Sequence, residues 1–273
     1  MRSVLSLAAV AFALSVSAPL PADAQKLAQP VEQDYKAKSP KLNKADIDAL
    51  LAKPDQLVIV DVRRPDELTE KGGFPAFLSI QAKDLENRLA FIPKDRTIIT
   101  VSNHAHRAGA AADYLADHGF KVAGAAGAQD YESQGGTIVK IAPPAPQPSA
   151  QTGAQDYKYK AAKLNKAQID ALLAKPEELL IVDVRRPDEI TASGGFSVFL
   201  SIQAKELESR LAFIPKDRTI ITVSNHFIRA GAAADYLAEH GYKVAGAASV
   251  LDYQSEGGAV VKIAPAAQTA SRP

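Results

Sequence analysis

Two six-residue segments with the pattern S-N-H-x-x-R bring together residue types that can do chemistry. They occupy residues 102–107 and 224–229. A serine hydroxyl can attack an ester when a histidine takes its proton, and a histidine follows each serine by two positions. The closing arginine can instead hold an oxyanion through two parallel hydrogen bonds. The segments therefore indicate either nucleophilic hydrolysis or the binding of a small anion.

The same residues are also compatible with a structural role. Hydrolysis would need Asp61 or Asp183 to orient the histidine, and a spacing of two positions does not ensure that serine and histidine touch. Arg107 and Arg229 can pair with carboxylates and brace the loops. Each histidine can serve only as a hydrogen-bond partner that shapes its loop. Anion binding, bracing and hydrolysis all stay open at this level.

Histidines near the two loops do not form a shared pattern of metal ligands. The first loop region holds His104, His106 and His118, whereas the second retains only His226 and His240. Structural and catalytic zinc sites take three or four protein ligands. We therefore expect no metal ion and no other cofactor.

The sequence around each loop alternates helix and strand. In the first copy, strands are expected over residues 57–61, 97–102 and 121–125. Asn43 is placed to cap the first helix, Pro65 suits the first turn of the next, and Gly119 is placed to end the helix after the loop. Residues 84–91 also have helical spacing. Residues 102–107 thus follow a strand end, where open parallel sheets bind ligands.

The chain contains an internal repeat. Residues 42–142 recur as residues 164–264 at an offset of 122 (164 − 42 = 122), without insertion or deletion, and about four positions in five are identical. We therefore expect two tandem α/β domains, residues 40–142 and 159–264, each a small open parallel sheet with helices on both faces. Residues 143–156 are rich in proline and predict a linker.

The motifs of both repeats resemble those of the rhodanese family. The resemblance is carried by D-V-R-x-P-x-E at residues 61–67 and 183–189, by the loop that closes with arginine, and by H-G-[FY]-K-V at residues 118–122 and 240–244. A glycine-containing turn lies between the first two motifs. The resemblance covers nearly all of both repeats and implies a rhodanese-like fold. It also implies a loop whose first residue, a cysteine in the family, carries sulfur as a persulfide.

The sequence departs from the family at the residue that would carry this chemistry. The family cysteine corresponds to Ser102 and Ser224, and the chain has no cysteine. Serine cannot form the sulfur–sulfur bond of a persulfide, and its hydroxyl is far less acidic than a thiol, whose pKa is about 8.5. Arg107 and Arg229 correspond to the arginine that closes the family loop. We expect a tandem rhodanese-like protein without persulfide sulfurtransferase activity.

We expect the two loops to bind a small oxyanion or a protein partner. The candidate binding residues are Ser102, Asn103, His104, Arg107, Ser224, Asn225, His226 and Arg229, supported by Asp61, Arg63, Asp183 and Arg185. The second loop region is more apolar, with Phe227, Ile228 and Leu251, which indicates a different ligand, a cover from the other repeat, or drift after duplication. The alternatives are a structural or interaction module with vestigial loops and a hydrolase that uses the loop serines.

Composition and the amino-terminal residues narrow the class of protein. The net charge is +1 and no run of basic residues stands out, which argues against a nucleic-acid partner. Arg2 precedes an apolar run at residues 4–18 that is short for a membrane span, and Ala22 and Ala24 resemble a cleavage site. We predict a signal peptide over residues 1–24, cleaved after Ala24. The expected mature protein is periplasmic or secreted and has no membrane span.

Overall fold

The computed structural model describes residues 35–140 and 156–262. These residues belong to one compact unit that begins at Tyr35. The predicted signal peptide at residues 1–24 lies outside the described residues, as does the predicted linker apart from its last residue, Asp156.

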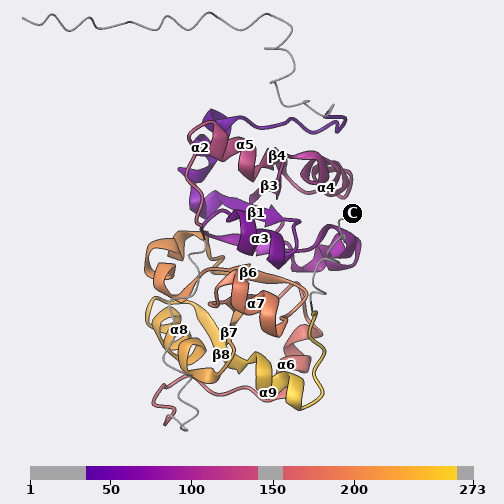
Figure 1. The fold of residues 1–273 in the computed structure, drawn as a ribbon. Coiled ribbons are helices and arrows are strands. Elements are labelled where there is room, and N and C mark those ends of the chain that lie inside the picture. The colour runs from indigo at the N-terminus through magenta and orange to yellow at the C-terminus, as the bar shows by residue number, and fades with distance from the viewer. Residues whose placement is uncertain (1–34, 141–155, 263–273) are drawn as a thin grey trace, which may run out of the picture. The chain divides into compact units, whose positions relative to one another are not determined.

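The first repeat is a four-stranded parallel sheet flanked by helices (Figure 1). Its elements are α2 (Lys44–Leu51), η1 (Pro54–Gln56), β1 (Leu57–Asp61), α3 (Pro65–Lys71), β2 (Phe77–Ser79), η2 (Ala82–Phe91), β3 (Thr97–Ser102), α4 (His106–Asp117), β4 (Val122–Gly127) and α5 (Ala128–Ser133). The strand order is β4-β3-β1-β2, and neighbouring strands run parallel.

The second repeat has the same architecture. Its elements are α6 (Lys166–Leu173), β5 (Leu179–Asp183), α7 (Pro187–Ser193), β6 (Phe199–Ser201), η3 (Ala204–Glu206), η4 (Glu208–Phe213), β7 (Thr219–Ser224), α8 (Phe227–Glu239), β8 (Lys243–Ser249) and α9 (Val250–Ser255). Its strands also run parallel, in the order β6-β5-β7-β8.

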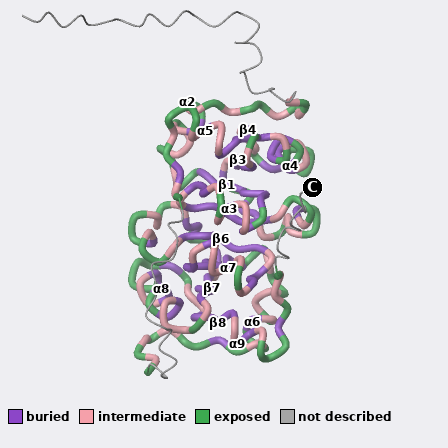
Figure 2. Tube along the Cα trace, viewed as in Figure 1, coloured by how far each residue is buried: buried purple, intermediate pink, exposed green. Residues whose placement is uncertain are grey.

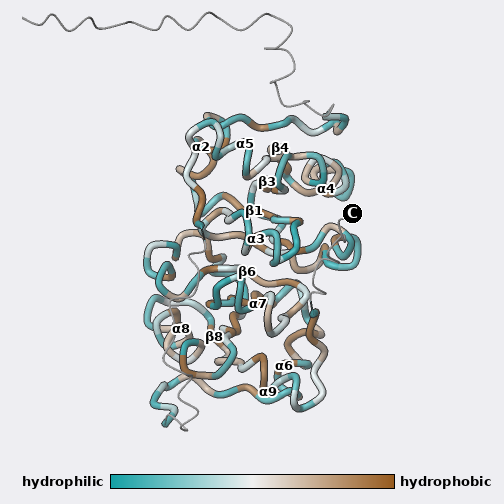
Figure 3. Tube along the Cα trace, in the orientation of Figure 1, coloured by the Kyte–Doolittle hydropathy of each residue, from teal (hydrophilic) through white to brown (hydrophobic). Residues whose placement is uncertain are grey.

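Helices cover both faces of the sheet, as predicted. On one face of the first repeat, Ile59 of β1 packs in a cluster with Ile47 of α2 and Leu68 of α3. On the other face, Val58 packs in a cluster with Leu115 of α4. The continuous apolar run of β1 follows from this arrangement, because successive side chains enter opposite cores. The strands are accordingly buried in Figure 2, and hydrophobic residues lie along β1 in Figure 3.

Local signals in the sequence are largely confirmed. The Asn43 side chain accepts a hydrogen bond from the Asp46 backbone amide, Pro65 is the first residue of α3, and Gly119 follows α4 with φ +81°. Two expectations need correction. Residues 82–91 form a 3-10 helix, and a fourth strand of only three residues, β2, was not predicted.

That short strand joins the two repeats. β2 pairs antiparallel with β6, so the two expected sheets form one sheet of eight strands. One apolar core also runs through both repeats, since Leu78 and Leu85 belong to the same cluster as Leu200 and Leu207. The two repeats therefore share a sheet and a core.

The residues ahead of each repeat are packed onto it. The Asp113 carboxylate accepts hydrogen bonds from the backbone amides of Lys38 and Ser39 at 2.8 and 2.7 Å. The Tyr35 hydroxyl donates to the Ser39 carbonyl at 2.7 Å. A side chain at Gly109 would stand 2.8 Å from the Tyr35 ring, so α4 needs a glycine here. The described fold thus begins a few residues before position 40, and Tyr157 and Asp235 make the corresponding contacts in the second repeat.

A small apolar cavity between the repeats gives a first testable prediction. Ala76 lines it together with Leu200 and Phe213 of the other repeat, and Val198 holds the position equivalent to Ala76. We expect Ala76→Val to raise the free energy of unfolding by about 0.5–1.5 kcal/mol, since two buried carbons are added at about 0.8 kcal/mol each, less some strain. Urea unfolding measures the change. Val198→Ala should lower stability, and a loss of stability in Ala76→Val would contradict the prediction.

Candidate functional site

Each loop rests on a buried aspartate–arginine pair at the end of the first strand of its repeat. The side chains of Asp61 and Arg63 are both fully buried. Arg63 Nε lies 2.9 Å from Asp61 Oδ1, and Nη2 lies 2.6 Å from Oδ2. Arg63 Nη1 donates to the Gly72 carbonyl and to Asn103 Oδ1, both at 3.0 Å. One guanidinium therefore ties the strand end, the glycine turn and the candidate loop together.

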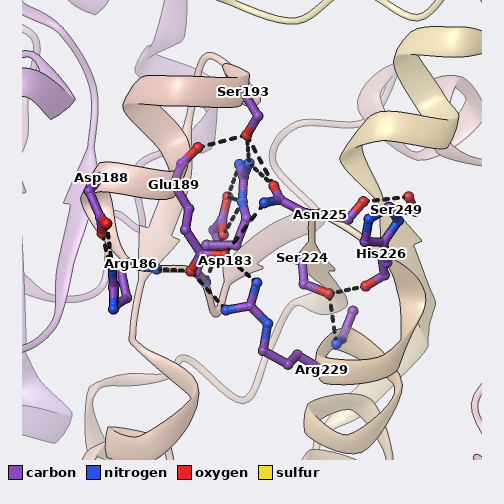
Figure 4. A network of polar contacts seen from close by, with 12 residues as sticks. Asp183, Arg186, Asp188, Glu189, Ser193, Ser224, Asn225, His226, Arg229 and Ser249 are labelled. Atoms are coloured by element: carbon purple, nitrogen blue, oxygen red, sulfur yellow. Dashed lines mark hydrogen bonds and ion pairs between the residues drawn. The ribbon is translucent and has the colours of Figure 1, made fainter. Parts of the chain in front are cut away.

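The second repeat builds the same arrangement (Figure 4). Arg185 binds Asp183 at 2.6 and 2.9 Å and donates to the Gly194 carbonyl at 3.0 Å. It also donates to Asn225 Oδ1 and to the Ser193 hydroxyl, each at 2.9 Å. Of the four residues predicted to support the loops, Arg63 and Arg185 donate to the loop asparagines. Asp61 and Asp183 pair with these two arginines.

The arginine that closes each loop is held by a glutamate. Arg107 Nη1 and Nη2 donate to the two carboxylate oxygens of Glu67 at 2.9 and 2.5 Å. Arg229 binds Glu189 in the same bidentate way at 2.8 and 2.5 Å. Both arginines therefore pair with carboxylates that brace the loops, which is one of the alternatives that the sequence left open. The carboxylate occupies the face of the guanidinium that an oxyanion would use.

Glu67 binds three different residues around the loop, and the sequence did not predict its pairing with Arg107. It accepts hydrogen bonds from Asn103 Nδ2 at 3.0 Å and from the Arg64 backbone amide at 3.1 Å. The Arg64 side chain pairs instead with Asp66, at 2.6 Å. The partners are 40 residues apart in sequence, and only the fold brings them together.

The electrostatics of these glutamates predict an acid-sensitive loop. Burial acts to raise the pKa of Glu67, but hydrogen bonds from Arg107 and the Arg64 amide outweigh it and hold the pKa below its usual 4.5. Glu189 behaves in the same way. A depressed pKa gives stability that is present above pH 4.5 and is lost as pH falls through the folded-state value. We expect the wild-type chain to lose stability in this range more steeply than Glu67→Gln/Glu189→Gln, as measured by urea unfolding at several pH values. Parallel pH curves would contradict the prediction.

The loop serines are buried and engaged with the following helix. Ser102 is 1% exposed, and its Oγ accepts a hydrogen bond from the Ala108 amide at 3.2 Å. Ser224 is fully buried, and its Oγ accepts from the Ala230 amide at 3.0 Å and donates to the His226 carbonyl. Each hydroxyl thus helps to anchor the start of the helix that follows the loop.

The histidine of the first loop contacts an aspartate and not the loop serine. His104 Nδ1 lies 2.8 Å from Asp130 Oδ1, and its side chain is largely exposed. In the second loop, Ser224 contacts the backbone carbonyl of His226. In the described residues, neither loop serine hydroxyl is hydrogen-bonded to an imidazole ring. A serine nucleophile would use such a contact to lose its proton.

The two loops differ in backbone as well as in sequence. Ala105 adopts a left-handed conformation with φ 64°, and α4 begins after it, whereas α8 begins one position earlier, at Phe227. Phe227 packs against Tyr157 at the edge of one apolar cluster, and Leu251 packs against another. Phe227 and Leu251 therefore pack against different apolar clusters of the second repeat.

Within residues 35–140 and 156–262, no group of three or more His, Asp or Glu side chains is placed to hold a metal ion. None of the helices in these ranges is long and apolar enough to cross a membrane.

Comparison with known proteins gave matches among solved structures. No family model and no curated protein matches the chain. A rhodanese-related protein from Thermoplasma volcanium is 22% identical (TM-score 0.34), over 37% of this chain and 98% of that one. A thiosulfate sulfurtransferase from Pseudomonas aeruginosa is 21% identical (TM-score 0.34), over 77% of this chain and 43% of that one. A protein of unknown function from Rhodopseudomonas palustris, described as a possible tyrosine phosphatase, is 27% identical (TM-score 0.33), over 37% and 85%.

The described chain has a rhodanese-like α/β fold. This agrees with the resemblance read from the sequence. In the rhodanese-like frame, Ser102 and Ser224 stand at the first loop position, and Arg107 and Arg229 close the loops. Each loop therefore begins with a buried serine and closes with an arginine that is already paired with a carboxylate.

Proposed function

We propose that this protein is an exported, non-catalytic tandem rhodanese-like protein that acts by binding a protein partner through its two braced loops. It transfers no sulfur, because the position of the persulfide-forming cysteine is serine in both repeats. Export is proposed from the signal-like features of residues 1–24.

The bidentate pairing of Arg107 with Glu67, and of Arg229 with Glu189, carries this proposal. A small oxyanion would have to displace a carboxylate that is already optimally placed, at the cost of leaving a partly buried glutamate without its partner. The braced loop keeps a fixed shape without any ligand. A fixed surface of this kind suits recognition of a protein better than capture of a free anion.

The test of the proposal is a sulfur-transfer assay of the mature chain with thiosulfate and cyanide. We expect no thiocyanate above the uncatalysed rate. Formation of thiocyanate by the wild-type chain would overturn the proposal. Immobilised mature protein with intact loops should capture a specific partner, and Glu67→Gln/Glu189→Gln should weaken that capture.

Introduction of the missing thiol gives a sharper prediction. We expect Ser102→Cys and Ser224→Cys to remain inactive, because each thiol would be buried and each loop arginine would still be paired with glutamate. The chain has no native cysteine, so labelling with a thiol reagent reports on a single site. The introduced loop thiols should react at least about tenfold more slowly than that of Ser209→Cys, which lies on an exposed residue. Sulfur transfer by either loop variant would show that the braced loop is still competent for catalysis.

A further inference from the structure

The two repeats meet through a surface that is its own complement. Leu78 of β2 pairs with Leu200 of β6, the residue 122 positions later (200 − 78 = 122). The flanking pairs are Phe77 with Ser201 and Ser79 with Phe199. Exchange of the two repeats therefore maps the Leu78 pair onto itself and interchanges the two flanking pairs. This is the property of the interface in a symmetric dimer.

The contact between the helices beside these strands has the same symmetry. Thr69 Oγ1 in α3 lies 3.2 Å from Thr191 Oγ1 in α7, and these residues are again 122 positions apart (191 − 69 = 122). A residue that meets its own counterpart lies on the axis that relates the two repeats. Thr69 and Thr191 therefore mark the centre of the interface on this face of the sheet.

Two buried arginines complete the reciprocal set. Arg96 Nη1 donates to the Phe213 carbonyl at 3.0 Å, and Arg218 Nη1 donates to the Phe91 carbonyl at 2.7 Å. Both arginines are more than nine-tenths buried. Each caps the end of the 3-10 helical segment of the other repeat, so the same donor and the same acceptor occur on both sides.

Both sides of the interface consist of nearly the same residues. The threonine, the strand F-L-S, the phenylalanine carbonyl and the arginine are identical in the two repeats. Ala76 against Val198 is a difference that bears on packing, because Ala76 lines the cavity between the repeats. A repeat can therefore offer the same contacts to a second copy of itself as to its neighbour in the chain.

We propose that this surface also joins two copies of the chain through exchange of repeats. The covalent link favours pairing within one chain, because it raises the local concentration of the partner repeat to the millimolar range. The surface itself does not distinguish a neighbour from a second copy. When the link is cut or the protein is concentrated, repeats pair between copies.

Linker cleavage of the full-length chain tests the proposal. A protease site is placed within residues 143–155, and the cleaved protein is incubated with an isotopically labelled copy and analysed by native mass spectrometry. We expect the halves to stay paired and to exchange with the labelled halves. Halves that separate, or that stay paired without exchange after partial unfolding and refolding, would overturn the proposal.

Charges placed at the interface centre make the test specific. In the cleaved protein, Thr69→Glu/Thr191→Glu should weaken the pairing of first with second repeats by about tenfold or more through like-charge contact. Thr69→Glu/Thr191→Arg should restore this pairing of first with second repeats. Thr137→Glu, on an exposed residue, is the matched control. The rescue by opposite charges separates an effect on pairing from a failure to fold. Equal pairing in all three variants would show that the exchanged dimer does not use this surface.

Discussion

Replacement of Arg63 with methionine should lower the free energy of unfolding by about 3–5 kcal/mol, the usual cost of breaking one side of a buried ion pair. The substitution removes the guanidinium that holds Asp61 at 2.6 to 3.1 Å, and it leaves a carboxylate that is fully buried. It also removes the donor to Gly72 and Asn103. Urea unfolding followed by circular dichroism measures the loss.

The adjacent residue in the sequence is the matched control. Arg64 pairs with Asp66 at a side chain that is about half exposed, so Arg64→Met should cost less than about 1 kcal/mol. Arg63→Met/Asp61→Asn should recover part of the loss, because the buried position no longer carries a charge. Equal losses in Arg63→Met and Arg64→Met would mean that the buried pair contributes no more than a surface pair.

Neutralising Glu67 and Glu189 should turn an anion-insensitive protein into one that binds sulfate. In Glu67→Gln/Glu189→Gln, the loop arginines lose their carboxylate partners, and the loops then present free guanidinium groups beside a helix start. An anion at 100 times its Kd should stabilise the folded variant by about 2.7 kcal/mol. Thermal unfolding with and without sulfate, thiosulfate, sulfite and phosphate gives the measurement, and the wild-type curves should not move.

Two controls decide how this result is interpreted. Glu70→Gln changes a glutamate of the same helix whose carboxylate pairs with Lys71, so it should leave the protein insensitive to anions. Addition of Arg107→Ala and Arg229→Ala to the glutamine variant should abolish the new response. A specific anion-dependent shift in the wild-type chain would contradict the braced-loop proposal and would favour the oxyanion-binding function expected from the sequence.

The sequence predicts those parts of the fold that depend on residues close together in the chain. Asn43, Pro65 and Gly119 each take the place that their capping or turn chemistry requires. The continuous apolar runs of β1 and β3 are strands covered on both faces. Such features depend on neighbouring residues, so they can be read without knowledge of the tertiary structure.

The features that the sequence did not reveal depend on distant partners. β2 has only three residues, too few for a periodic pattern, and its neighbour β6 lies in the other repeat. The pairing of Arg107 with Glu67 spans 40 positions. A charged residue next to a loop has many possible partners of opposite charge along the chain. Arg107 and Glu67 meet because β1 and β3, which they follow in sequence, lie side by side and parallel in the sheet.

The packed segments ahead of the repeats have a consequence for the growth of the sheet. β4 and β8 are its outermost strands, and an open strand edge invites further strands to add to it. Backbone hydrogen bonds from the leading segments, at Ala125 with Pro40 and Leu42 and at Ala247 with Ala162 and Leu164, occupy part of each outer edge. These bonds leave fewer unpaired backbone groups at the two outer edges of the sheet. Addition of a strand from another molecule to the eight strands of the described residues is thereby disfavoured.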